Sequence, residues 1–219
     1  MTAARIHVAC SPVAELLREA PRATDWLTPQ ERQRLALLRS DKRRDQFLAA
    51  RWQARRLLAY ALGGSPADWP LTAMPDAPPS IEGRGDLHLS ISHSGDCAAA
   101  GVALDPIGLD IEAPSRRRDI EGLAQLCCTP SEVALMRAAV DPEAEFYALW
   151  TAKEAWLKRR REWIAPQRLR QLELRPAIEP DVRTWSEAGW TVALCGGGEV
   201  RWWTDEPASL RGWHVHDAA

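Results

Sequence analysis

The order of helix-forming and strand-forming segments constrains the fold of this chain more than any other feature. An amphipathic helical pattern runs from about residue 43 to 62 and ends at Gly63-Gly64, because glycine commonly follows the last helical turn. Alternating apolar and polar residues over 87–92 predict a half-buried strand. We expect residues 93–96 to form a turn and residues 97–104 to return as a second strand. The first half of the chain therefore indicates a long helix followed by strands.

The second half repeats this order. Its predicted segments are a strand over residues 108–112, helices over 120–139 and 142–161, and strands over 171–174, 190–195 and 200–203. We expect Gly196-Gly197-Gly198 to form a hairpin turn between the last two strands. Helices and strands in separate runs are typical of α+β domains. We predict an α+β fold in two halves, residues 1–104 and residues 105–219.

Two short segments carry a helix-start signature. Thr28-Pro29-Gln30-Glu31 and Thr129-Pro130-Ser131-Glu132 each place Thr at the N-cap, Pro at the first helical position and Glu at the third. In such a capping box the Thr and Glu side chains satisfy backbone N–H groups that lack a helical partner. We expect helices to begin at both prolines, so that the pattern over 120–139 is broken near Cys127-Cys128.

The composition excludes several classes of protein. Of the 219 residues, 46% are hydrophobic and 26% are charged, which is typical of a globular chain with a substantial core. A formal net charge of -2 gives no global field that would attract nucleic acid. The longest uncharged apolar run, residues 97–104, is too short to span a bilayer, and the N-terminal segment lacks a signal-peptide pattern. The five cysteines show no zinc-like spacing, so we expect reduced thiols and a cytoplasmic protein.

Two carboxylates stand inside the apolar segment Gly108-Leu109-Asp110-Ile111-Glu112. Alternate side chains of a strand share a face, so Asp110 and Glu112 would lie together with their Cα atoms about 6.5–7 Å apart. That spacing lets both side chains reach one small cation. An ordinary strand with a solvated polar face would show the same pattern. The segment alone does not decide between these interpretations.

A third carboxylate follows on the predicted helix over 142–161. Glu154 falls on the apolar stripe of Phe146, Trp150 and Leu157, where an uncompensated charge is unfavourable. A salt bridge to Lys158, one turn further on, would be the simplest compensation. A cation shared with Asp110 and Glu112 would be another, because three carboxylates at one site repel one another without it. Hard oxygen ligands suit Mg²⁺, and carboxylates, Mg²⁺ and basic residues together indicate phosphoryl chemistry.

Taken together, three segments resemble the 4′-phosphopantetheinyl transferases of the surfactin-activator type. They are Ser90-Ile91-Ser92-His93-Ser94, the strand 108–112, and the helical segment 150–158 with sequence WTAKEAWLK. The Trp and Lys-Glu-Ala of the last segment resemble one bacterial subgroup. The resemblance implies a pseudo-two-fold pair of similar α+β subdomains and a monomer. It also implies transfer of the phosphopantetheine arm of coenzyme A to a serine of an apo acyl or peptidyl carrier protein, which releases 3′,5′-adenosine bisphosphate.

The same resemblance implies roles for residues of the second half. Asp110, Glu112 and Glu154 match the family's Mg²⁺ ligands. Lys158 matches a lysine near the phosphates, where it would neutralise charge or assist the leaving group. The base that deprotonates the attacking serine would be Glu154 or a metal-bound water. Glu132 matches another family acid near the site.

In the first half, Ser92 and His93 match a turn that contacts the 3′-phosphate of the nucleotide. Arg34 and Arg44 lie where the family carries basic residues for that phosphate. One departure concerns the nucleotide: Ala77-Pro78-Pro79 stands where the family often has Gly-Lys-Pro, so a lysine is missing.

Two basic clusters, Arg116-Arg117-Arg118 and Lys158-Arg159-Arg160-Arg161, would suit docking of an acidic carrier protein. Two other functions use the same residues. One is a Mg²⁺-dependent phosphohydrolase acting on coenzyme A or a nucleotide, and the other is a non-catalytic carrier-binding homologue. Fatty-acid, polyketide and nonribosomal-peptide carriers are equally compatible with the sequence.

Overall fold

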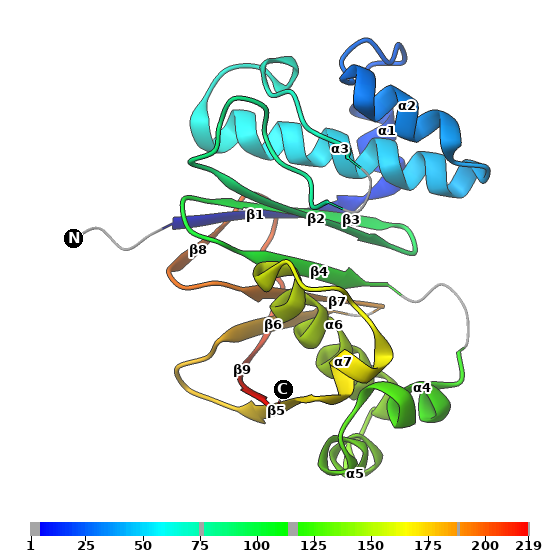
Figure 1. Cartoon of the computed structure of the whole chain (residues 1–219), viewed down its shortest axis with the longest axis vertical. Helices are drawn as coiled ribbons and strands as arrows, with labels where there is room; N and C mark the ends of the chain where they lie inside the picture. Colours follow the sequence, from blue (N-terminus) through cyan, green and yellow to red (C-terminus); the bar gives the residue numbers. More distant parts are fainter. Residues whose placement is uncertain (1–4, 75–76, 114–117, 188, 219) are drawn as a thin grey trace. The chain divides into compact units, whose positions relative to one another are not determined.

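The chain forms two compact units, each with its own sheet and helices (Figure 1). The computed structural model describes residues 5–74, 77–113, 118–187 and 189–218. The first unit comprises Met1–Ile107 and Gly197–Glu206, and the second comprises Gly108–Gly196 and Pro207–Ala219. The predicted α+β class is confirmed. The predicted division needs correction, because residues 197–206 belong to the first unit and the second half is therefore interrupted.

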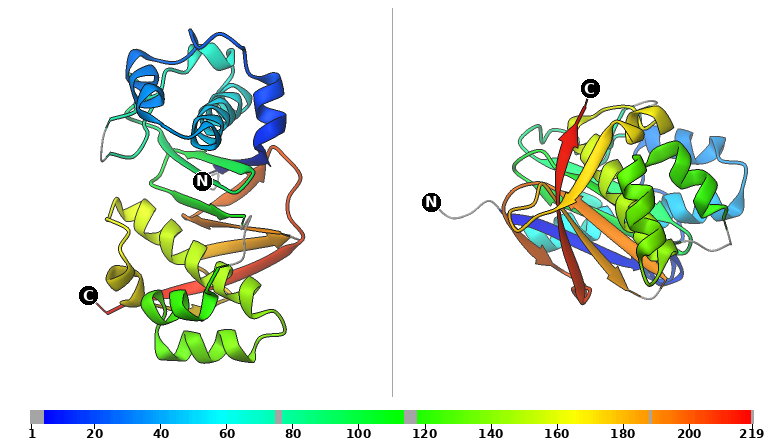
Figure 2. Two further views of the ribbon diagram at one scale, coloured as in Figure 1. Left: turned by 90° about the vertical axis from the view of Figure 1, so that its right-hand side faces the viewer. Right: turned by 90° about the horizontal axis from the view of Figure 1, so that it is seen from below.

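In the first unit, a four-stranded sheet of order β2-β3-β1-β8 is covered by helices. Its elements are β1 (Arg5–Pro12), α1 (Val13–Glu19), α2 (Pro29–Leu37), α3 (Asp41–Leu62), the 3₁₀ helix η1 (Pro66–Asp68), β2 (His88–Ser94), β3 (Cys97–Ala103) and β8 (Glu199–Trp202). The long helix α3 lies on the sheet, where Ala54, Leu57 and Leu58 pack against Ala100 and Val102 of β3. Figure 2 shows this packing of helix on sheet from two further sides.

In the second unit, a five-stranded sheet has the order β4-β7-β6-β9-β5. Its elements are β4 (Gly108–Glu112), α4 (Ile120–Cys127), α5 (Pro130–Ala138), α6 (Pro142–Arg160), α7 (Pro166–Arg170), β5 (Leu172–Pro176), β6 (Val182–Glu187), β7 (Trp190–Cys195) and β9 (Ser209–Asp217). The long helix α6 packs on β4, β7 and β6. Leu149, Ala152 and Leu157 of α6 are buried in this core with Val182 and Trp213 from the sheet.

The two units share one strand arrangement around their long helices. In the first, β2 and β3 form an antiparallel hairpin and β1 pairs antiparallel with β3. In the second, β6 and β7 form the hairpin and β4 pairs antiparallel with β7. The three-stranded sets β2-β3-β1 and β6-β7-β4 therefore correspond. This agrees with two similar α+β subdomains.

The expected hairpin at Gly196-Gly197-Gly198 is wrong. β7 pairs with β4 and β6, whereas β8 pairs parallel with β1 in the sheet of the first unit, so that Ile6 lies opposite Val200. Glycines indicate a change of direction but not the strand that the chain meets next, and the edge of β1 accepts β8. β1, β6 and β9 were not predicted.

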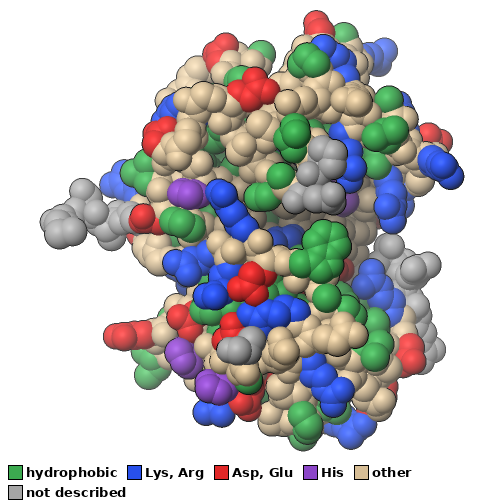
Figure 3. All heavy atoms as spheres, in the orientation of Figure 1, with side chains coloured by type: hydrophobic (Ala, Val, Ile, Leu, Met, Phe, Trp, Pro, Cys, Tyr) green, Lys and Arg blue, Asp and Glu red, His purple; other side chains and the backbone are tan. Residues whose placement is uncertain are grey.

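Both predicted helix starts are confirmed. Thr28 and Thr129 are N-caps of complete capping boxes, with Glu31 and Glu132 at the third helical position. The long helices also agree with prediction to within two residues at each end, 41–62 for α3 and 142–160 for α6. Over the described residues, none of the helices has the length and apolar character needed to cross a membrane. Acidic and basic side chains are interspersed on the face seen in Figure 3.

Candidate metal and phosphate site

Gly108 brings β4 and α6 close together at the candidate site. A Cβ atom on Gly108 would overlap the backbone carbonyl of Ala155 and the backbone N–H of Arg159, both on α6. β4 is held on its other side by β7, where Asp110 lies opposite Ala193 and Glu112 opposite Thr191. The glycine of this segment therefore sets how near the strand carboxylates come to the helix.

The carboxylate of Asp110 is paired with Lys158 across this contact. Lys158 Nζ lies 2.5 Å from Asp110 Oδ1, and the two side chains are 24% and 4% exposed. Burial alone would lower the pKa of Lys158, but Asp110 and Glu154 raise it above its ordinary value. The ammonium group is therefore fixed in its charged form beside the acids. The simple helical bridge from Lys158 to Glu154, considered from the sequence, is replaced by a bond between helix and strand.

Glu154 lies near enough to the strand acids for their charges to act on it. Its pKa is raised to about 8, chiefly by burial and then by the negative charge of Asp110, with Glu112 adding to the effect. Lys158 opposes this shift. The structure therefore brings together the three predicted carboxylates and the predicted lysine within the second unit.

These carboxylates fit Mg²⁺ by the kind of donor that they offer. They supply hard oxygen atoms, and burial first, then the charges of Asp110 and Glu112, raise the pKa of Glu154, so a cation would favour its ionised form. Their oxygens are not gathered around one point: among the described residues, no three His, Cys, Asp or Glu side chains form a group that could hold a metal ion.

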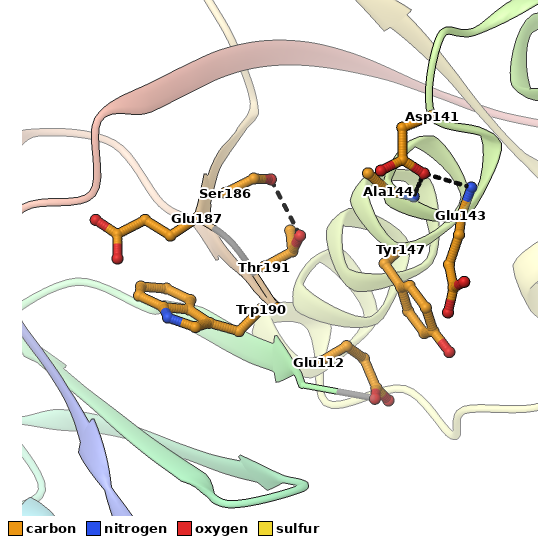
Figure 4. Close-up of a pocket in the computed structure, with 10 residues that line it drawn as sticks. Glu112, Asp141, Glu143, Ala144, Tyr147, Ser186, Glu187, Trp190 and Thr191 are labelled. Atoms are coloured by element: carbon orange, nitrogen blue, oxygen red, sulfur yellow. Dashed lines mark hydrogen bonds between the residues drawn. The ribbon is translucent and has the colours of Figure 1, made fainter. Parts of the chain in front are cut away.

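A cavity of about 230 Å³ adjoins Glu112 (Figure 4). It is lined by the end of β4, the first turns of α6 and the β6–β7 hairpin, and Tyr147 and Trp190 contribute its aromatic side chains. Arg118 Nη1 lies 4.0 Å from Glu112 Oε2. The sequence did not predict this cavity, because β6, whose pairing with β7 builds one wall, was not predicted.

Glu132 occupies a different environment from the other acids. Its Oε2 accepts hydrogen bonds from Lys153 Nζ at 2.6 Å and from the backbone N–H of Thr129 at 2.7 Å. Its Oε1 accepts from the backbone N–H of Leu174 at 2.9 Å. The side chain is only 2% exposed. These bonds join α5, α6 and β5.

Ser92 and His93 lie in the first unit and belong to a strand. The predicted turn over 93–96 is therefore corrected: β2 continues to Ser94, and the turn consists of Gly95 and Asp96, with Gly95 at a φ of 54°. Neighbouring strand residues face opposite sides, so Ser92 is buried and His93 is exposed.

Arg34 and Arg44 also lie in the first unit, on α2 and α3. Arg34 is exposed, while Arg44 Nη1 donates a hydrogen bond of 3.1 Å to the carbonyl of Leu35. Two further arginines of α3 are paired within the first unit: the fully buried Arg55 pairs with Glu31 at 2.6 Å, and Arg51 donates to the carbonyl of Thr72.

The predicted basic clusters are only partly described. Arg116 and Arg117 lie outside the described residues, and Arg118 contacts Glu112 as given above. The second cluster forms the C-terminal end of α6, where Arg161 caps the helix in the left-handed conformation with a φ of 57°. Basic groups there complement the helix dipole.

The family follows from a sequence comparison over the region that contains these acids. Residues 106–215, half of the chain, match the sequence model of the 4′-phosphopantetheinyl transferase superfamily. The chain belongs to this superfamily. The matched region contains Asp110, Glu112, Glu154 and Lys158.

Individual relatives agree with this assignment. The 4′-phosphopantetheinyl transferase HetI of Nostoc is 29% identical over 147 residues, which cover 64% of this chain and 62% of that protein. A 4′-phosphopantetheinyl transferase of Bacillus subtilis is 32% identical over 106 residues, covering 48% of this chain and 46% of that protein. The chain thus spans less than two thirds of the length of these relatives. A structure of Mycobacterium tuberculosis acyl carrier protein synthase matches 46% of this chain and 96% of its own, with 19% identity and a TM-score of 0.33.

Proposed function

We propose that this protein transfers the 4′-phosphopantetheine arm of coenzyme A to a serine hydroxyl of an apo acyl or peptidyl carrier protein. The products would be the holo carrier and 3′,5′-adenosine bisphosphate. The observation that carries the proposal is the Lys158–Asp110 pair beside Glu154, in the region that matches the superfamily. Acids that bind a cation and a fixed ammonium group are suited to a pyrophosphate substrate.

In this proposal Asp110, Glu112 and Glu154 hold Mg²⁺. The ion, when bound, would neutralise charge on the pyrophosphate that is being cleaved. Lys158 provides a second positive charge, and its release from Asp110 would let the ammonium group turn to a phosphate oxygen. The second unit therefore supplies the charge stabilisation, which is the largest contribution expected in such chemistry.

Among the candidate bases we favour Glu154 for the proton of the attacking serine. Burial and the neighbouring acids raise the pKa of Glu154 to about 8 without a cation, and bound Mg²⁺ would lower it, so Glu154 would accept the proton through an oxygen that does not hold the ion. Glu132 is less suited to the role, since backbone N–H groups and Lys153 already occupy both of its oxygens. A water near the site is the alternative base.

Ser92, His93, Arg34 and Arg44 are the proposed contacts of the nucleotide 3′-phosphate. His93 and Arg34 are both exposed at the surface of the first unit, where an anion can approach them. We also propose that the protein is of the surfactin-activator type with the Trp and Lys-Glu-Ala motif, and that it acts as a monomer. Trp150, Lys153 and Glu154 on α6 are the motif residues.

The test is incubation with coenzyme A, Mg²⁺ and several apo carrier proteins, followed by the intact mass of each carrier. We expect a gain of one phosphopantetheine arm, lost in EDTA and in Asp110→Asn, but retained in Glu199→Gln. Glu199 forms a surface pair with Arg201 in the first unit, so Glu199→Gln removes one carboxylate as Asp110→Asn does and serves as the matched control.

Either of two outcomes would contradict the proposed transfer and favour another function. Release of adenosine bisphosphate from coenzyme A without a carrier would identify a phosphohydrolase. Coenzyme A binding without mass gain in any carrier type would favour a non-catalytic carrier-binding homologue. Oligomeric state is measured on the same sample by light scattering.

A further inference from the structure

Two cysteines face each other across neighbouring strands of the first unit. In the antiparallel pairing of β1 with β3, Cys10 lies opposite Ala99 and Cys97 lies opposite Pro12. Cys97 and Ala99 are two residues apart and share a face of the sheet, so Cys10 and Cys97 are diagonal neighbours on that face. Their thiols are joined by a hydrogen bond. The strand register therefore holds the two sulfur atoms together.

The remaining cysteines have a different environment. Cys127, Cys128 and Cys195 are buried, while Cys10 and Cys97 are half-buried. Burial raises the pKa of the Cys128 and Cys195 thiols to about 12 and also raises that of Cys127. Such thiols are poor nucleophiles, because the thiolate is the reactive form.

The pKa of the Cys97 thiol is shifted in the opposite direction, below its ordinary value. The hydrogen bond from Cys10 lowers the pKa of the Cys97 thiol, against the effects of burial and of the negative charge of Asp96. Cys97 also stands directly after the Gly95-Asp96 turn, at the end of the hairpin, where small molecules reach it more easily than the sheet interior. Proximity, partial exposure and thiolate character thus coincide at one of the five cysteines.

We propose that Cys10 and Cys97 form a redox-active pair that a low-molecular-mass disulfide converts into an intramolecular disulfide. The Cys97 thiolate attacks one sulfur of the oxidant, forms a mixed disulfide and releases one thiol. The Cys10 thiolate then attacks the Cys97 sulfur and releases the second thiol. The protein loses two protons and two electrons, and the oxidant takes them up as it is reduced to two thiols.

The disulfide would change the sheet face that carries Ser92. Ser92, Ala99 and Cys10 lie in one row across β2, β3 and β1, so Ser92 and the thiol pair face the same side. Diagonal positions have Cα atoms about 7–8 Å apart, which exceeds the usual span of a disulfide of about 4.4–6.8 Å. Closure therefore requires β1 and β3 to shift at the hairpin. This consequence rests on the proposed function, in which Ser92 contacts the nucleotide.

The test is oxidation of the full chain by glutathione disulfide, followed by digestion without reduction and mass spectrometry of the peptides. We expect a Cys10–Cys97 cross-linked peptide, reversal by dithiothreitol, and unmodified Cys127, Cys128 and Cys195. In Cys10→Ser we expect glutathione to remain on Cys97, since the resolving thiol is missing. Glutathione that remains on Cys97 in the unmodified chain, or modification of the three buried cysteines first, would overturn the proposal.

Coenzyme A binding, measured by calorimetry, tests the link to the site. We expect the oxidised chain to bind at least tenfold more weakly than the reduced chain. The control variant Cys195→Ser keeps Cys10 and Cys97, so its binding should weaken on oxidation by the same factor. Equal binding by the oxidised and reduced chains would refute the effect on the site. If the reduced chain itself fails to bind coenzyme A, the proposed function fails, whereas the cross-linked peptide is detected independently of it.

Discussion

Lys153 Nζ lies 2.6 Å from Glu132 Oε2, and both side chains are at least 98% buried in the second unit. Lys153 belongs to the Lys-Glu-Ala motif of α6, and its ammonium group donates hydrogen bonds to the capping glutamate of α5 and to the carbonyl of Cys127. The first unit repeats the relationship: Glu31 of the α2 capping box pairs with the buried Arg55 of α3 at 2.6 Å. In each unit a short capped helix is thus held to the long helix by a buried ion pair.

We predict that Glu132→Gln destabilises the fold and leaves the chemistry of folded molecules intact. Removing one partner of a buried pair typically costs about 3–5 kcal/mol, because the other charge is left uncompensated. Urea denaturation measures the free energy of unfolding, and the double variant Glu132→Gln/Lys153→Met should recover part of the loss. Asp86→Asn, which breaks an exposed pair with Arg84, is the control and should have little effect. A stable Glu132→Gln protein with a collapsed kcat would instead make Glu132 catalytic.

We predict that Gly108→Ala separates β4 from α6. The new methyl group would overlap the backbone of Ala155 and Arg159, and overpacking of this kind costs about 1–3 kcal/mol or more. The matched control is Gly197→Ala, since a Cβ at Gly197 meets no atom within 4 Å. Thermal unfolding should show a loss for Gly108→Ala alone, together with weaker Mg²⁺ binding by calorimetry. Equal melting temperatures for the two variants would contradict the close approach.

The stability of the metal-free protein should fall as the pH rises. Glu154 has a pKa of about 8 in the folded chain, above its ordinary value of 4.5, so the folded state binds the proton more tightly. The resulting contribution is fully present below about pH 4.5 and is lost as the pH rises through about 8. Melting curves in EDTA at pH 6 and pH 9 should differ less for Glu154→Gln than for the unmodified chain. Mg²⁺ at pH 9 should restore stability, and no restoration would argue against a metal at these acids.

Lys158→Met should lower kcat of the proposed transfer by about 10²–10³-fold, as for other groups that stabilise developing charge. Lys158→Arg should retain part of the activity, since it keeps the positive charge. Steady-state kinetics with coenzyme A and a carrier protein separate kcat from KM. A change in KM alone would mean that Lys158 only helps to bind the substrate.

Local patterns were sufficient for the features that depend on neighbours in sequence. The capping boxes at Thr28 and Thr129 and the extents of α3 and α6 depend on contacts within a few residues, and all were predicted. The alternation of Asp110 and Glu112 on β4, and the stripe position of Glu154, likewise follow from strand and helix periods. The sequence by itself therefore determined the α+β class and the candidate acids.

Tertiary structure decided the partners of those residues. Lys158 pairs with Asp110 rather than with Glu154, and Glu132 is enclosed by Lys153 and two backbone N–H groups. β8 pairs with β1 in the first unit, although the glycines before it indicated a hairpin with β7. Each of these choices depends on which distant surface lies within hydrogen-bonding range, and a local pattern holds no information on that distance.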